Sequence, residues 1–245
     1  MEERLYTMPL MDAFRAEDEC PFCYVEKMLE EHALDFVLGA EVSYMQKEVR
    51  AKTDQMGFCR EHWKKMYAYG NSLGNALILD THLQRLRGEL KESMNKDCSK
   101  KWLRKVQDSV SQLLRKEQET CYICEEMKRN YERYLATFFE LFRKQEKEFM
   151  ELLKSGKGFC LIHFADVLDA APKFLGAKEE QELRGILYPQ MLCNLDRIQE
   201  ELDWFEKKFD YRYREADWKQ SKDVIPRAMQ KIAGGYPAAE NYRQK

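Results

Sequence analysis

The chain has few residues that break helices, with only 11 glycines and 6 prolines among 245 residues. Both fall below average usage, which is about 7% for glycine and 5% for proline. Charged residues make up 34% of the chain and aromatic residues 12%, and so many aromatics are untypical of a disordered chain. The composition therefore predicts an all-α protein folded as a helical bundle.

Long apolar segments and targeting signals are also missing. No run of 18 apolar residues is present, so no transmembrane helix is expected. The first 20 residues carry acidic side chains where a signal peptide needs a basic segment followed by an apolar one. We therefore expect a cytoplasmic protein without a membrane partner, in which the thiols of all 8 cysteines stay reduced.

Common catalytic and nucleotide-binding motifs are absent as well, including GxGxxG, GxxxxGK[ST], HExxH and GxSxG. The formal net charge of −2 gives no support for a nucleic-acid partner. One helix face over residues 100–116 is basic and could touch nucleic acid, but a solvated face is the simpler interpretation. No catalytic residue is predicted from these patterns.

The cysteines and histidines, in contrast, form two groups with the same spacing. In each group a Cys-x-x-Cys pair is followed, 36 positions after its second cysteine, by the cysteine of Gly-Phe-Cys-x-x-His. Corresponding residues of the groups are 101 positions apart, which indicates an internal duplication. The first group is Cys20, Cys23, Cys59 and His62, and the second is Cys121, Cys124, Cys160 and His163.

Three cysteines and one histidine match the ligand set of a tetrahedral zinc site. Thiolates favour zinc over magnesium or calcium, which prefer oxygen ligands. We predict two structural zinc ions per chain, each joining a CxxC pair to the CxxH pair that follows it. An iron–sulfur cluster is the alternative metal centre. Buried structural thiols and disulfides are the alternatives to metal binding.

Helices are expected to begin at each CxxC and at each Gly-Phe-Cys, where the helix dipole favours thiolates. Pro21 suits the first turn of such a helix. Gly57 and Gly158 precede the third cysteine, where a tight turn around an ion would need a positive φ. The first CxxC helix should break near Gly39, whereas its counterpart should run from about residue 124 to 154.

The duplication continues with a change of length. The pattern at residues 83–90 returns at 195–202 with an offset of 112, so the second copy has gained 11 residues. Eleven residues are about three helical turns, and the insertion should lengthen a helix in phase. We predict a first repeat at 1–98, a linker helix and second repeat at 99–215 with the linker over 99–117, and a tail at 216–245.

Apolar spacing predicts two long helices, at 71–93 and 179–214. The first carries Ala76, Leu79, Leu83, Leu86 and Leu90, and the second carries Tyr188, Met191, Leu195, Ile198, Leu202, Phe205 and Phe209. Pro189 should kink the second helix, and Pro226 should start a short helix that Gly234-Gly235 ends. Residues without a repeated partner are interpreted as ordinary thiols (Cys98, Cys193), a surface histidine (His32) and a packed histidine (His82).

The segments CPFC to GFCREH and CYIC to GFCLIH, with LGNALILDTHLQRL, resemble an uncharacterised bacterial family known only as a domain of unknown function. The resemblance extends to KKFDYRYREADW near the end of the chain. It implies a helical bacterial protein with metal sites and no established activity. Tyr122-Ile123 replaces the Pro-Phe of the first copy, so the two sites need not bind metal equally.

We therefore expect a zinc-binding protein that acts as an interaction or scaffold module, with a protein partner on a helical surface. One alternative is an enzyme that uses a metal or thiolate site, or a pocket between helices. Another is a nucleic-acid-binding regulator that uses the basic linker helix. Metal content, pocket structure and salt-dependent binding to nucleic acid distinguish the three.

Overall fold

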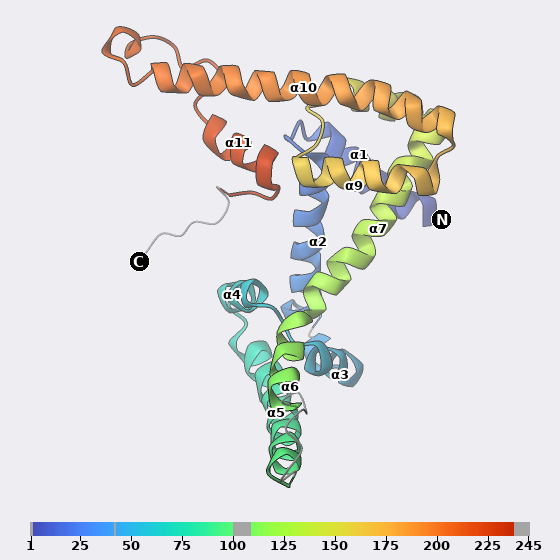
Figure 1. Ribbon diagram of the computed structural model, residues 1–245, viewed down its shortest axis with the longest axis vertical. Helices are drawn as coiled ribbons and strands as arrows, with labels where there is room; N and C mark the ends of the chain where they lie inside the picture. The colour runs from blue at the N-terminus through green and yellow to red at the C-terminus, as the bar shows by residue number, and fades with distance from the viewer. Residues whose placement is uncertain (1, 42, 100–108, 238–245) are drawn as a thin grey trace. The chain divides into compact units, whose positions relative to one another are not determined.

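The computed structural model describes residues 2–41, 43–99 and 109–237 (Figure 1). These residues form eleven α-helices and two 3-10 helices, with no strand among them, so the all-α prediction is confirmed. The helices are α1 (Glu2–Arg15), α2 (Pro21–Leu38), α3 (Lys47–Met56), α4 (Arg60–Tyr69), α5 (Ser72–Ser99), α6 (Ser109–Glu119), α7 (Tyr122–Arg143), α8 (Lys147–Ser155), α9 (Leu161–Phe174), α10 (Ala177–Lys207) and α11 (Val224–Ala233), with η1 at Ser43–Met45 and η2 at Tyr211–Tyr213. Within the described ranges, none of them has the length and apolar character needed to cross a membrane.

The helices fall into two compact units that do not follow the order of the chain. Unit 1 comprises residues 1–27 and 131–245, and unit 2 comprises residues 28–130. The chain thus starts unit 1, builds unit 2 and returns to complete unit 1. Helices α2 and α7 each contribute one end to each unit. The repeat boundaries near residues 98 and 215 concern the sequence duplication and stay a prediction.

Unit 1 is built around phenylalanine side chains. Phe22 and Phe159 stack with ring centroids 5.6 Å apart, and Phe138 meets Phe149 edge to face at 5.4 Å. All four are buried. Phe22 lies between the cysteines of the first CxxC, and Phe159 precedes Cys160, so this core holds two distant segments together. In the same unit α9 and α11 pack beside α10 (Figure 1).

Unit 2 has a smaller core that performs the same task. Phe58 meets Trp63 with ring centroids 4.9 Å apart and Tyr122 at 6.4 Å. The Tyr122 amide donates a hydrogen bond to the carbonyl of Gly57 at 3.0 Å, which ties the segment before α4 to the start of α7. The buried core also contains Val37, Leu38, Tyr44, Met66, Ile78, Cys121 and Ile123.

The break after the first CxxC helix is confirmed, but its predicted counterpart is wrong. Helix α2 ends at Leu38, just before Gly39. The helix predicted over residues 124–154 is divided, because α7 ends at Arg143 and α8 begins at Lys147. Gln145 has a φ of 51° at this break. The Glu146 carboxylate accepts a hydrogen bond from the Phe149 amide at 2.6 Å and caps α8, so the turn forms without glycine or proline.

The 11-residue insertion is shared between two helices and does not lengthen only one. Helix α9 has 14 residues and α4 has 10, a difference of four. Helix α10 begins 18 residues before Leu195, whereas α5 begins 11 residues before Leu83, a difference of seven. Four and seven residues are about one and two turns, so the helices on both sides of the connecting turn stay in phase.

The leucine stripe predicted on the helix at 71–93 is not the buried face of α5. Ile78 and His82 are buried, whereas Leu79 is 39% and Leu83 59% exposed. On α10, Met191 and Ile198 of the predicted stripe are buried, while Tyr188 and Phe209 are exposed. Pro189 lies inside α10.

The C-terminal short helix matches its prediction. Helix α11 spans Pro226 and ends at Ala233, directly before Gly234. The predicted linker helix matches only in part, since α5 extends to Ser99 and α6 begins at Ser109. Residues 100–108, which include Trp102, Leu103 and Val106, lie outside the described residues.

Candidate metal centres

The eight predicted ligands all lie at helix N-termini. Cys20 directly precedes α2 and Cys121 directly precedes α7, so that Cys23 and Cys124 fall in the first turns. Cys59 and Cys160 are the N-caps of α4 and α9, with His62 and His163 three residues further on. Each pair therefore sits where helix amide groups and the dipole favour negative charge.

Gly57 and Gly158 give both histidine-bearing helices their entry turns. Their φ values are 59° and 73°, as the sequence predicted. A side chain is strained in this region of backbone conformation. At Gly57 a Cβ atom would also lie only 3.0 Å from the ring of His82.

The eight residues form two clusters, but the pairing predicted from the sequence is wrong. Each CxxC pair meets the CxxH pair of the other sequence group, not the one that follows it. The unit 1 cluster is Cys20, Cys23, Cys160 and His163, and the unit 2 cluster is Cys59, His62, Cys121 and Cys124. The reason is the course of the chain, which builds all of unit 2 between the two halves of unit 1.

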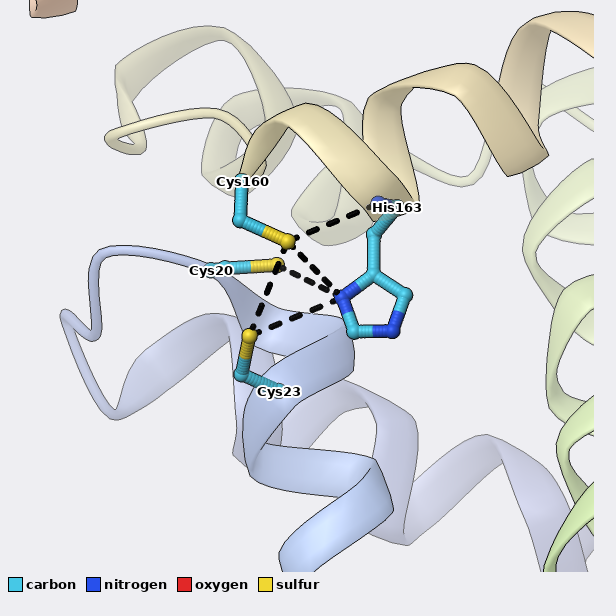
Figure 2. Close-up of side chains that lie close together, drawn as sticks. All are labelled: Cys20, Cys23, Cys160 and His163. Atoms are coloured by element: carbon cyan, nitrogen blue, oxygen red, sulfur yellow. Dashed lines mark hydrogen bonds between the residues drawn. The ribbon is translucent and has the colours of Figure 1, made fainter. Parts of the chain in front are cut away.

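In the unit 1 cluster three sulfur atoms surround one imidazole nitrogen (Figure 2). The Nδ1 atom of His163 lies 3.3 Å from Sγ of Cys20, 3.5 Å from Sγ of Cys23 and 3.2 Å from Sγ of Cys160. The Sγ atoms of Cys23 and Cys160 are 3.8 Å apart. Cys20 and Cys23 come from the start of α2, and Cys160 and His163 from the start of α9 (Figure 2).

The unit 2 cluster repeats this arrangement. The Nδ1 atom of His62 lies 3.2 Å from Sγ of Cys59, 3.2 Å from Sγ of Cys121 and 3.3 Å from Sγ of Cys124. The Sγ atoms of Cys59 and Cys124 are 3.9 Å apart. In both clusters all four ligand atoms lie within 4.8 Å of one another.

Hydrogen bonding does not account for this geometry. An imidazole Nδ1 atom is either a donor of one proton or an acceptor at one lone pair, so it cannot bond well to three sulfurs at once. A tetrahedral ion with bonds of about 2.3 Å to sulfur and 2.0 Å to nitrogen places its ligand atoms about 3.5 to 3.8 Å apart. The observed separations of 3.2 to 3.9 Å bracket that range. Both clusters could therefore hold a metal ion.

Two glutamates missed by the sequence analysis support the histidines. Nε2 of His163 lies 3.3 Å from the Glu26 carboxylate, and Nε2 of His62 lies 3.1 Å from that of Glu30. A carboxylate at Nε2 holds the proton there and leaves the Nδ1 lone pair for an ion. The ammonium group of Lys65 also binds Glu30, at 2.7 Å. Because Glu26 follows Cys23 by three helical positions, its place on the same face could have been predicted.

The charge states show what a cation would replace. Burial lowers the pKa of His163, but hydrogen bonds with Cys160 and Cys23 outweigh it and raise this pKa to about 12. Hydrogen bonds from Cys20 and Cys23 hold the pKa of Cys160 far below its usual range, whereas burial raises that of Cys20. Without an ion, protons are thus trapped among the ligands. Binding of a divalent cation would release them.

The unit 2 cluster shows the same competition for protons. Burial lowers the pKa of His62, and hydrogen bonds with Cys121 and Glu30 raise it to about 10. Burial raises the pKa of Cys121, but its hydrogen bond with His62 and others lower it to about 6.

The surroundings of the unit 1 cluster include a buried lysine that the sequence analysis also missed. Lys231 of α11 is 0% exposed. Its ammonium group donates hydrogen bonds of 2.7 Å to the carbonyls of Glu19 and Lys157. These residues lead into Cys20 and Cys160, so Lys231 connects the two segments that bring the ligands together. Its charge also lies close to a group of thiols, which favours their ionised form.

The remaining cysteines and histidines lie outside both clusters. His82 is buried and hydrogen-bonds the carbonyl of Asp54 at 2.9 Å, which confirms a packed histidine. His32 is exposed, as predicted, and so is Cys193. The side chain of Cys98 lies outside the described part of the chain.

A hollow of about 410 Å³ lies in unit 1, beside Pro21 and Gly158. Its polar lining includes Arg15, Asp18 and Lys157. None of the eight ligands lines it. It therefore gives no direct access to the unit 1 cluster.

With this geometry in hand, the chain can be compared with known proteins. The model of a family described as "Family of unknown function (DUF6062)" matches residues 1–239. The chain belongs to this family. The match confirms the resemblance to a family of unknown function that the motifs indicated. No curated protein and no solved structure matches the chain.

Proposed function

We propose that this member of DUF6062 is a zinc-binding interaction module, in which one structural zinc ion joins two helix N-termini in each unit. The observation that carries the proposal is the arrangement of three sulfurs around one Nδ1 atom, found twice. Four protein ligands fill a tetrahedral shell, whereas catalytic zinc keeps a position open for water or substrate. Three thiolates also make zinc a weak Lewis acid, so the ions hold the fold and do not catalyse.

The two sequence copies support a common origin for the two units. Helices α2 and α7 begin 101 positions apart, and so do the N-caps of α4 and α9. Because a CxxC of one copy meets the CxxH of the other, we propose that the duplicated repeats exchanged their halves. Each unit would then be one complete repeat assembled from two sequence copies.

Metal content and spectroscopy test the zinc assignment. Protein purified without added metal should contain two equivalents of zinc per chain by elemental analysis. Replacement with cobalt should give the absorption of tetrahedral S₃N coordination at both sites. Iron in place of zinc, or a coordinated water in the shell, would contradict the structural assignment and favour an electron-transfer or catalytic role.

The interaction role needs a surface, and α5 supplies one. Leu73, Leu79 and Leu83 are 62%, 39% and 59% exposed along one side of this 28-residue helix. The spacing at 76, 79, 83, 86 and 90 is that of a coiled-coil seam. The charges beside the seam favour a second copy in antiparallel orientation, since the exposed Asp80 of one copy would then face the exposed Arg87 of the other.

We therefore expect a homodimer through α5 in which Leu83 lies near the two-fold axis. Sedimentation should show that Leu83→Glu and Asp80→Arg weaken the dimer at least tenfold, because each places charge against apolar or like-charged groups. The double exchange Asp80→Arg with Arg87→Asp should restore it. Leu192→Glu, at a 64% exposed position of α10, is the matched control and should leave the dimer intact. A monomeric wild-type protein would show that α5 serves another partner.

A further inference from the structure

The two clusters have the same ligand types but differ in access to solvent. In unit 1, Cys20, Cys23 and Cys160 are 0%, 1% and 0% exposed. In unit 2, Cys124 is exposed and Cys59 is partly exposed, while Cys121 is buried. A reagent in solution therefore reaches sulfur in one cluster and not in the other.

The turn that follows α11 covers the unit 1 sulfurs. The amide of Gly235 donates a hydrogen bond to Sγ of Cys23 at 3.3 Å. A Cβ atom on Gly234 would lie 3.5 Å from Sγ of Cys160, so a glycine lets the backbone pass close to the sulfurs. Tyr236 fixes the end of the turn through a hydrogen bond of 2.8 Å from its hydroxyl to the Asp18 carboxylate.

We propose that the unit 2 cluster is a modification site, at which a small soft electrophile adds to Cys124, whereas the turn after α11 seals the unit 1 cluster. The inference rests on the proposed zinc-bound state. In a loaded cluster the cysteine ligands are thiolates. Their reactivity is then ordered by exposure, and the exposed Cys124 reacts first.

The chemistry suits an α,β-unsaturated carbonyl compound. The Sγ atom forms a bond to the β-carbon, the carbon–carbon π bond breaks, and the α-carbon takes a proton from water. The product is a thioether, which lacks the negative charge of the thiolate it replaces. The unit 2 cluster then has only two thiolates and one imidazole, and its ion is released.

Labelling of the zinc-loaded full chain with N-ethylmaleimide tests the site, in a Cys98→Ser background. The zinc content before labelling tests the proposed function separately. The exposed Cys193 serves as an internal reference, because it lies outside both clusters. Peptide mapping should show that Cys124 reacts at least tenfold faster than Cys20, Cys23 and Cys160, and one zinc equivalent should leave in step with its label. Equal labelling of both clusters, or a Cys124 adduct that retains two zinc ions, would overturn the proposal.

Two truncations test the seal. A chain ending at residue 233 keeps α11 but loses the turn, and a chain ending at residue 237 keeps both. Labelling of Cys23 should rise at least tenfold in the shorter chain and stay unchanged in the longer one. Circular dichroism establishes that both chains are folded, and zinc content that both remain loaded. If the shorter chain does not fold, Tyr236→Phe, which removes the bond to Asp18, should increase Cys23 labelling in the full chain. Unchanged Cys23 labelling in a folded variant would contradict the seal.

Discussion

Removal of both metal ions is expected to lower the melting temperature of the protein by ~10 °C or more and to reduce its helical content. Each ion joins segments far apart in the sequence, such as Cys23 and Cys160, and so replaces contacts that a small core does not supply. Without the ion, the unit 1 ligands keep an imidazolium among thiols, and their buried charges are only partly compensated. Thermal unfolding by circular dichroism, with and without a strong chelator under reducing conditions, measures the effect.

Readdition of metal provides the control for this experiment. Zinc should restore the original melting temperature, and magnesium should not, because it prefers oxygen ligands. The Cys193→Ser variant should behave like the wild type in every arm, since Cys193 belongs to neither cluster. A chelated protein that melts with the wild type would mean that packing of the phenylalanine core alone holds unit 1 together.

The sequence was sufficient to predict the ligands and the local structure around them. Fixed spacing brought out all eight residues, and the CxxC and Gly-Phe-Cys segments begin helices at the expected positions. The positive φ of Gly57 and Gly158 was also predictable, because a tight turn before a capping cysteine requires it. These features depend on residues close together in the chain.

The partners of these segments could not be predicted in the same way. Within one chain, a CxxC can meet either CxxH without any change of local structure, and the choice depends on how α2 and α7 extend between the units. The break at Gln145 was missed because Glu146 caps α8 without a glycine or proline signal. The buried face of α5 was missed because Gly74, Ile78 and His82 pack inward and the leucines do not.

The crossed pairing leads to the second large effect, which concerns pairs of cysteine variants. With one zinc ion per cluster, Cys20→Ser combined with Cys160→Ser disrupts a single cluster, and one equivalent of zinc should remain. Cys20→Ser combined with Cys59→Ser disrupts both clusters, and no zinc should remain. Pairing of each CxxC with the CxxH that follows it would give the opposite result for both variants. Elemental analysis of the two purified proteins therefore distinguishes the pairings, with Cys193→Ser as the control that should keep two equivalents.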